Sequence, residues 1–323
     1  MRGLLHRFIV PLVLAVALPQ ARGVTASFAS PALDKWMYGS VPGSVGGSRD
    51  TAPVFGFPNS PTEEDRLGQM LVAFQTSTQV TSGLVAASYQ ITRVTLSVFT
   101  SASFVPYDPT FDSFKTYLDA SDPLRQVDTD AGRPVEVFGV GLRNGFTSLS
   151  ASLSGSTIYN ENSAFGASGV AIHGRNAYAL TYDTVGATVD VSDNVSERFE
   201  ATPWAIGQVA GVTPGQDIPE GSEYRFTLDL SSAAVRTYLQ NGLSSGILGL
   251  MVTSLTPVPG QGSDTPYPSF LTKENQIGPE YTPRLEVEYT IVPIPEPNTA
   301  TNVLLGVGLL AALRGWRSRD RFS

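Results

Sequence analysis

The chain contains no cysteine and only two histidines, His6 and His173. The lack of cysteine excludes disulfide bonds, thiolate metal sites and cysteine nucleophiles, so burial of apolar surface must hold the fold together. His6 lies in a segment that we interpret below as an export signal, which leaves one imidazole in the rest of the chain. A single imidazole excludes a metal centre built from several histidines.

Charged residues are also scarce, at 15% of the 323 residues, and 21 basic residues face 29 acidic ones. The formal net charge of −8 argues against a nucleic-acid partner, because phosphate binding needs a dense surface of lysine and arginine. By contrast, the chain has 31 glycines and 23 prolines. This composition indicates many turns between short strands and predicts an all-β protein.

Residues 1–26 have the layout of a secretory signal peptide. A basic start is followed by an apolar stretch over residues 8–18 and by small residues over 21–26. The apolar stretch is too short to span a bilayer comfortably, which favours a cleaved signal over the alternative, an uncleaved anchor. We therefore predict export through the Sec machinery, with cleavage after Gly23 or Ala26.

The C-terminal residues 293–323 carry a second pattern. The tripeptide Pro295, Glu296 and Pro297 precedes an apolar run over residues 303–313. An arginine cluster then follows at Arg314, Arg317, Arg319 and Arg321. Proline keeps the approach to the run extended, and arginines beyond a membrane segment stay on the cytoplasmic side. The pattern predicts a C-terminal hydrophobic helix in the membrane, with the tripeptide displayed outside the cytoplasm.

This tail resembles the PEP-CTERM sorting signal, which combines a Pro-Glu-Pro motif, a hydrophobic helix and a terminal arginine cluster. The resemblance implies recognition by an exosortase, a membrane enzyme thought to cut near the tripeptide in bacteria that make exopolysaccharide. An ordinary single-pass anchor is the alternative. In both cases, we expect the protein to work in the cell envelope or outside the cell.

Between the two signals, residues 27–292 show the alternation of apolar and polar residues that is typical of β-strands. The clearest strands are predicted at 94–98, 224–230 and 285–291, and further ones at 69–75, 135–140, 187–191 and 247–254. Two short helices are predicted, one over 113–118 capped by Asp112 and one over 233–240 capped by Ser232, with Gly242 just past its end. We found no long linker or internal repeat, which favours a single domain.

Several segments of this body follow one another in an order similar to that of the DNRLRE-type domain, a module of secreted bacterial proteins. The matching segments are 71–74, 91–96, 226–230, 246–248, 270–274 and 283–289. The resemblance implies an all-β, jelly-roll-like β-sandwich related to carbohydrate-binding modules.

Five aromatic residues in segments expected to be loops are candidates for stacking on sugar rings: Trp36, Tyr38, Tyr107, Trp204 and Tyr267. An aromatic ring packs against the C–H groups of a pyranose, and tyrosine or tryptophan adds a polar group at the ring edge. The alternative is that these rings fill the ends of the sandwich, where large aromatics supply buried area.

The segment Asp128-Thr-Asp130-Ala-Gly132 places two alternating carboxylates before a glycine. A tight loop of this kind can wrap oxygen ligands around Ca²⁺, so Asp128 and Asp130 are candidate calcium ligands. The alternative is a solvated acidic loop, in a part of the chain that also contains Asp108, Asp112, Asp119 and Asp122.

Catalytic motifs are lacking. His173 would have to be the base of a Ser-His-Asp hydrolase, and no Gly-x-Ser-x-Gly motif accompanies it. We therefore expect a structural or adhesive role without catalysis. A carbohydrate-binding module for extracellular polysaccharide, with or without calcium, is the first alternative, and a polysaccharide hydrolase or lyase is the second.

Overall fold

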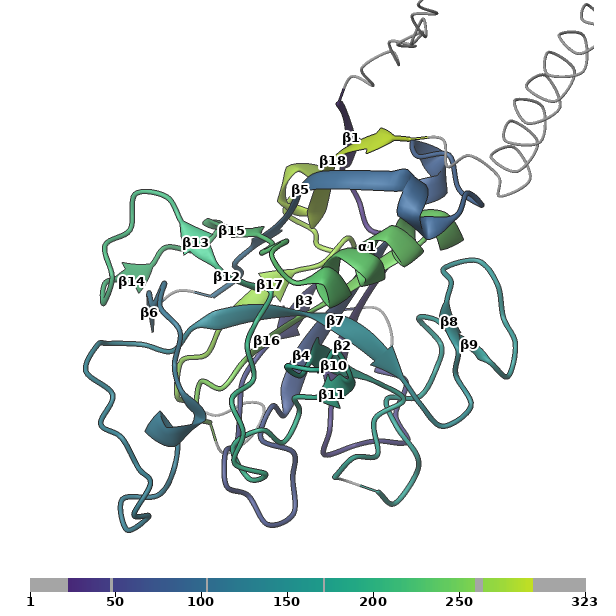
Figure 1. The fold of residues 1–323 in the computed structure, drawn as a ribbon. Coiled ribbons are helices and arrows are strands. Elements are labelled where there is room, and N and C mark those ends of the chain that lie inside the picture. Colours follow the sequence, from purple (N-terminus) through teal and green to yellow (C-terminus); the bar gives the residue numbers. More distant parts are fainter. Residues whose placement is uncertain (1–22, 47–48, 103, 171, 259–263, 293–323) are drawn as a thin grey trace, which may run out of the picture.

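The computed structural model describes residues 23–46, 49–102, 104–170, 172–258 and 264–292 (Figure 1). The regular elements in these ranges are mostly antiparallel β-strands, together with one α-helix, which agrees with the predicted all-β class. Residues 1–22 of the predicted signal peptide lie outside the described residues, as does the whole predicted sorting tail, residues 293–323. Within the described residues, no helix combines the length and the apolar character that a membrane span requires.

Two large sheets form the frame of the molecule. The first has the order β1-β18-β5-β15-β13. Its strands span Val24–Phe28 (β1), Arg284–Ile291 (β18), Tyr89–Phe99 (β5), Glu223–Thr227 (β15) and Gln208–Val209 (β13). The second has the order β11-β10-β7-β16-β4-β2, with β12 also paired to β7. Its strands span Thr188–Asp190 (β11), Ala177–Tyr182 (β10), Val135–Leu142 (β7), Leu248–Ser254 (β16), Gly68–Phe74 (β4), Leu33–Tyr38 (β2) and Ala205–Ile206 (β12).

Smaller pairs and single turns complete the body. The pairs join Thr51–Pro53 (β3) to Ser269–Leu271 (β17), Val105–Pro106 (β6) to Asp217–Ile218 (β14), and Ser148–Leu149 (β8) to Ile158–Tyr159 (β9). Short 3₁₀ turns lie at Thr76–Thr78, Ala86–Ser88, Phe114–Thr116 and Pro279–Tyr281.

The two large sheets share one hydrophobic core. Leu96, Phe226 and Val287 come from the first sheet, and Phe138 and Leu250 from the second, and all five are fully buried in the same cluster. Burial of apolar side chains between facing sheets is what makes a β-sandwich stable. The arrangement is therefore that of an all-β sandwich.

The predicted alternation holds in β15 and β18 but not in β5. Tyr224 and Phe226 are buried, while their neighbours along β15 are exposed. In β5, however, Thr95 and Ser97 are buried as well, so the expectation that they face water is wrong. β5 is an inner strand, paired with β18 on one side and β15 on the other, and side chains of neighbouring strands reduce the exposure of its outer face.

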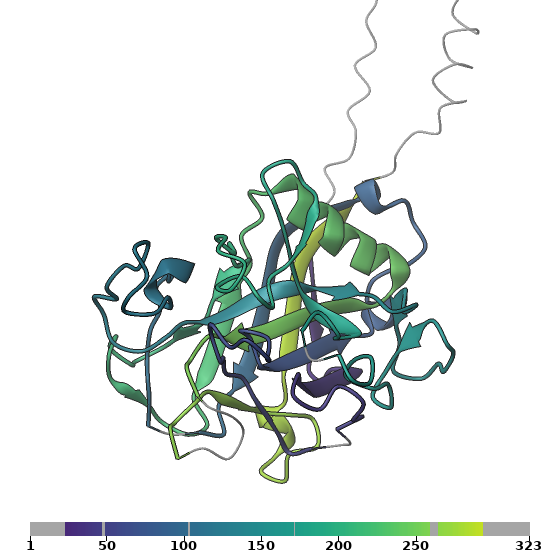
Figure 2. The same cartoon turned by 90° about the horizontal axis from the view of Figure 1, so that it is seen from below.

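The helix α1 spans Ala233–Ser245 and lies beside β5 in both views (Figures 1 and 2). Ser232 caps it as predicted, since its hydroxyl accepts the N–H of Val235. The predicted end at Gly242 is wrong. The buried positions recur every four residues as far as Leu243, and the helix ends at Gly246, whose φ of +82° suits glycine.

The other predicted helix, over 113–118, is reduced to the single 3₁₀ turn Phe114–Thr116. Its cap is Ser113, whose side chain accepts the N–H of Lys115, and not Asp112. The carboxylate of Asp112 is engaged elsewhere, by the hydroxyl of Tyr117 and the guanidinium of Arg133.

The first and last described strands are neighbours. β1 pairs antiparallel with β18, and Val24 lies opposite Tyr289. β1 also crosses the predicted boundary between signal peptide and body, because it begins at Val24 and not after Ala26. The two ends of the described body therefore lie side by side at one edge of the sandwich.

Candidate functional site

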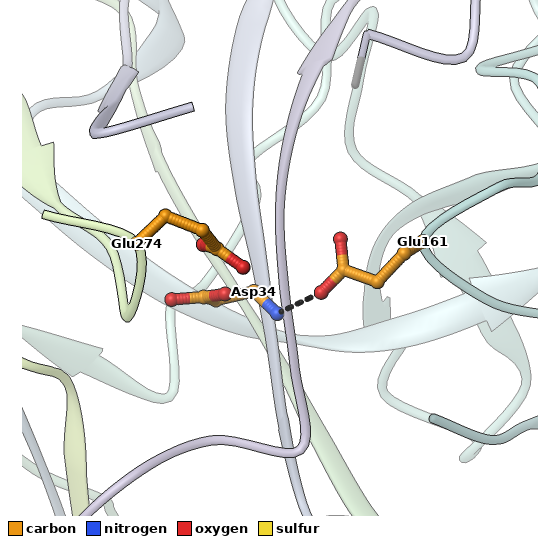
Figure 3. A group of neighbouring side chains, drawn as sticks. All are labelled: Asp34, Glu161 and Glu274. Carbon is orange, nitrogen blue, oxygen red and sulfur yellow. Dashed lines mark hydrogen bonds between the residues drawn. The ribbon is translucent and has the colours of Figure 1, made fainter. Parts of the chain in front are cut away.

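Three carboxylates from distant parts of the chain meet beside β2 (Figure 3). Asp34 comes from β2, Glu161 follows β9 and Glu274 follows β17, and one oxygen of each lies within 4.8 Å of the others. Lys273 lies among them, with Nζ 2.6 Å from Asp34 Oδ1 and 3.0 Å from Glu274 Oε1 and in contact with Glu161 as well. The ammonium group therefore supplies the positive charge that a metal ion would otherwise bring.

The electrostatics of this cluster follow from burial. Burial raises the pKa of Asp34 to about 7, although Lys273 acts to lower it. Burial alone would lower the pKa of Lys273, but the neighbouring carboxylates of Asp34 and Glu161 raise it above its ordinary value. The cluster is best described as an ion-paired junction between β2 and two loops, which sequence reasoning did not predict.

A second group of carboxylates includes a predicted calcium ligand. One oxygen each of Asp108, Asp112 and Asp130 lies within 4.8 Å of the others. Asp128 is instead ion-paired, with its Oδ2 2.7 Å from Arg133 Nη1, and the same nitrogen lies 2.6 Å from Asp112 Oδ2. The structure thus brings Asp130 together with two carboxylates about twenty positions earlier in the chain.

Asp108 is the most buried member of this group, at 3% exposure. Its Oδ1 accepts the N–H of Thr110 at 2.8 Å and contacts the Thr110 hydroxyl at 2.6 Å. Its Oδ2 is buried and has no hydrogen-bond partner among the described residues. Burial raises the pKa of Asp108, and the carboxylates of Asp112 and Asp130 raise it further.

The predicted sugar-stacking aromatics are mostly core residues. Trp36, Tyr107 and Trp204 are all buried, so their rings cannot stack on a sugar at the surface. Trp36 is part of β2, and its indole N–H donates to the carbonyl of Pro53 at 2.9 Å. Trp204 lies over β7, where a Cβ at Gly139 would come within 2.3 Å of its ring. These rings fill the sandwich, as the alternative interpretation expected.

Tyr38 and Tyr267 are only partly buried. Tyr38 stacks on Trp36, and Tyr267 packs against Phe55 at a ring-centroid distance of 5.1 Å. Tyr267 also lines a hollow of about 660 Å³, together with the acidic residues Asp50, Glu220 and Asp264. Of the five aromatics, Tyr267 is therefore the one placed beside a polar hollow.

His173 is paired with two carboxylates. Its Nδ1 lies 3.1 Å from Asp193 Oδ2, and its Nε2 lies 3.2 Å from Glu197 Oε1. Both ring nitrogens thus face acids, whereas a Ser-His-Asp hydrolase needs Nε2 to face a serine hydroxyl. The geometry therefore does not suit the base of such a triad.

A buried ionic network was missed by sequence reasoning. The consecutive residues Glu64, Asp65 and Arg66 are all buried. Arg66 pairs with Glu136 at 2.5 Å, and Glu64 pairs with Arg175. Asp65 accepts the backbone N–H groups of residues 195 and 196 at 2.8 and 2.7 Å. The partners are between 70 and 131 positions away in the chain, so no local pattern indicates them.

The pH dependence of stability should reveal the titration of the buried carboxyl group of Asp193. Burial raises its pKa from 3.8 to about 8, and the carboxylate of Glu64 adds to the effect. A group whose pKa is raised on folding contributes stability that is full below its unfolded pKa and is lost as pH rises through the folded pKa. We therefore expect Asp193 to make the free energy of unfolding decline between about pH 4 and pH 8.

The check is urea unfolding across that pH range. Asp193→Asn keeps a neutral side chain that can still accept the N–H of Asp65, so the decline should become shallower. Glu223→Gln, at an exposed strand position, should leave the profile of the unsubstituted chain unchanged. Equal slopes for the chain and for Asp193→Asn would contradict the assignment.

Comparisons with family models and with curated proteins give no match for this chain. Its function must therefore be inferred from its own residues and fold.

Proposed function

We propose that the chain is an exported protein, sorted by its C-terminal tail to the cell envelope or the extracellular matrix. Its β-sandwich body has a structural or adhesive role and no catalytic one. The observation that carries the proposal is the pair of terminal sequence patterns, the signal-peptide layout of residues 1–26 and the Pro-Glu-Pro tripeptide, apolar run and arginine cluster of residues 293–323. The pairing of β1 with β18, in which Val24 lies opposite Tyr289, places the two ends of the described body side by side. A C-terminal tail that holds the body at this sheet edge leaves the rest of its surface to face outward.

The positions of the two signals agree with this arrangement. Pro295 follows the last residue of β18, Ile291, by four positions, so a cut near the tripeptide leaves the strand whole. Cleavage after Gly23 likewise leaves β1 whole, whereas cleavage after Ala26 would remove three of the five residues of β1, including the buried Ala26. We therefore favour Gly23 as the site of signal cleavage.

The finer fold that we propose is the jelly roll. If β1, β4, β5, β7, β10, β15, β16 and β18 are numbered one to eight, the sheet orders become 1-8-3-6 and 2-7-4-5. This is the connectivity of two Greek keys folded together, which defines an eight-stranded jelly roll. Glycan binding is the alternative role for such a body, and we propose it only for the hollow beside Tyr267.

Fractionation of a tagged protein tests the sorting proposal. An epitope inserted in the turn at Val185, which is highly exposed, leaves both ends of the chain free. In a host with an exosortase, we expect the tagged full chain in the envelope or matrix fraction. Deletion of residues 293–323 should move most of it to the medium, and deletion of residues 2–23 should keep it in the cytoplasm.

Two results would count against the proposal. One is a full chain that stays in the cytoplasm, because the terminal segments would then not act as signals. The other is an unchanged distribution after deletion of residues 293–323. Arg236→Gln changes a residue of the body and leaves both terminal segments intact, so it is a control that should not alter the distribution.

A further inference from the structure

The acidic group beside η3, the 3₁₀ turn Phe114–Thr116, carries more negative charge than its neighbours balance. It contains Asp108, Asp112, Asp128 and Asp130, and the carboxylates of Asp128 and Asp130 also interact with each other. Arg133 pairs with Asp112 and Asp128. Among the described residues, neither Asp108 nor Asp130 forms an ion pair with a cationic side chain. One guanidinium thus faces four carboxylates.

The buried oxygen of Asp108 is an independent sign of a ligand. Asp108 is 97% buried, and its Oδ2 has no hydrogen-bond partner among the described residues. Most buried carboxylate oxygens in folded proteins have a donor or a cation, because an uncompensated charge is costly in the interior. One oxygen of Asp108 lies within 4.8 Å of an oxygen of Asp112 and of an oxygen of Asp130, so its carboxylate is part of the group. A cation placed there would meet three oxygens.

Calcium fits these ligands best. Ca²⁺ binds carboxylate and other oxygens at about 2.3–2.6 Å, so two oxygens on one ion lie up to about 5 Å apart. The oxygens of this group lie within 4.8 Å of one another. The group offers no nitrogen or sulfur donor, which zinc would prefer. Asp130 is exposed, so water can complete the six to eight ligands that calcium takes.

We propose that Asp108, Asp112 and Asp130 bind one calcium ion, which ties the loop at 128–132 to the segment 108–112. The sequence pattern predicted Asp128 as a ligand. Its carboxylate is ion-paired with Arg133, so Asp128 lies beside the proposed site and does not bind the ion. The ion would brace the long connection between β6 and β7, residues 107–134, in which the described regular structure is one 3₁₀ turn. This inference does not depend on export or sorting.

Calorimetric titration of the full-length chain with CaCl₂, after treatment with EDTA, tests the proposal. We expect a dissociation constant of about 10⁻⁴–10⁻³ M, the range of extracellular calcium modules, and a higher melting temperature when calcium is present. Asp108→Asn and Asp130→Asn should each weaken binding by about tenfold or more. Asp119→Asn removes an exposed carboxylate from the same connection and should bind like the unsubstituted chain.

Three outcomes would overturn the proposal. The first is the lack of both heat and a melting shift up to roughly 10 mM CaCl₂, well above the expected range. The second is tighter binding of MgCl₂ than of CaCl₂. The third is a loss of binding in Asp128→Asn while Asp130→Asn binds normally, because Asp128 would then be the ligand. Asp130 is exposed, so its variant is expected to fold even if Asp108→Asn does not.

Discussion

Substitution of Arg66 by Met is expected to lower the free energy of unfolding by about 3–5 kcal/mol, because it leaves the carboxylate of Glu136 without a cation in the core. The two side chains are 2% and 4% exposed, and Arg66 Nη1 lies 2.5 Å from Glu136 Oε2. Arg66 also donates to the hydroxyl of Thr253 at 2.8 Å and to the carbonyl of Val191 at 3.1 Å. Methionine fills similar space but satisfies none of these acceptors.

Urea unfolding at neutral pH measures this loss. The control is Arg93→Met, which removes an equivalent ion pair at the surface: Arg93 and Glu288 lie 2.7 Å apart with side chains 44% and 36% exposed. Exposed pairs contribute at most about 1 kcal/mol. The double variant Arg66→Met with Glu136→Leu should recover much of the loss, since it leaves no unpaired charge. Equal losses for Arg66→Met and Arg93→Met would show that Glu136 is solvated.

Substitution of Phe226 by Ala should also cost about 3–5 kcal/mol of unfolding free energy. Phe226 is fully buried in β15, within the core that the two sheets share. Truncation removes apolar surface from that core and leaves a cavity. The two hydrogen-bonded sheets cannot move close enough to each other to fill it. Buried aromatic rings such as that of Phe226 therefore help to hold the two sheets together.

Truncation of an exposed phenylalanine to alanine is the control for Phe226→Ala. Phe111 is 45% exposed, so Phe111→Ala is expected to change the unfolding free energy by only about 0.5 kcal/mol. Both variants can be measured by denaturant unfolding with identical probes. A loss of less than about 1 kcal/mol for Phe226→Ala would mean that the two sheets do not enclose a common core.

Local patterns predicted the regular elements well where one face of a strand is exposed. The alternation over 285–291 corresponds to β18, in which buried residues alternate with partly exposed ones. The strand predicted at 247–254 corresponds to β16, although every residue of β16 is buried. Ser232 was predicted as a helix cap because its hydroxyl satisfies an N–H only three residues away. The predicted helix end failed at Gly242 because the packing of Leu243 extends the helix by another turn.

Site residues were harder to predict, because their partners are far away in the chain. Trp36 and Trp204 resembled loop aromatics, but their burial depends on strands that lie beside them only after folding. Asp128 and Asp130 formed a visible motif, yet the structure separates their roles: Asp128 pairs with Arg133, and Asp130 meets Asp108. Spacing in the sequence does not show which carboxylates converge.

The sequence by itself determined the all-β class, the positions of seven of the described strands and the lack of cysteine chemistry, because these depend on composition and on contacts between residues close in the chain. Only the tertiary structure decided that residues 64–66 are buried and paired, that β1 lies against β18, and which carboxylates gather around Asp108. The physical reason is that burial of a charge is tolerated only beside its partner. In this protein, the ion-pair partners of Arg66 and Glu64 are supplied by residues 70 and 111 positions away.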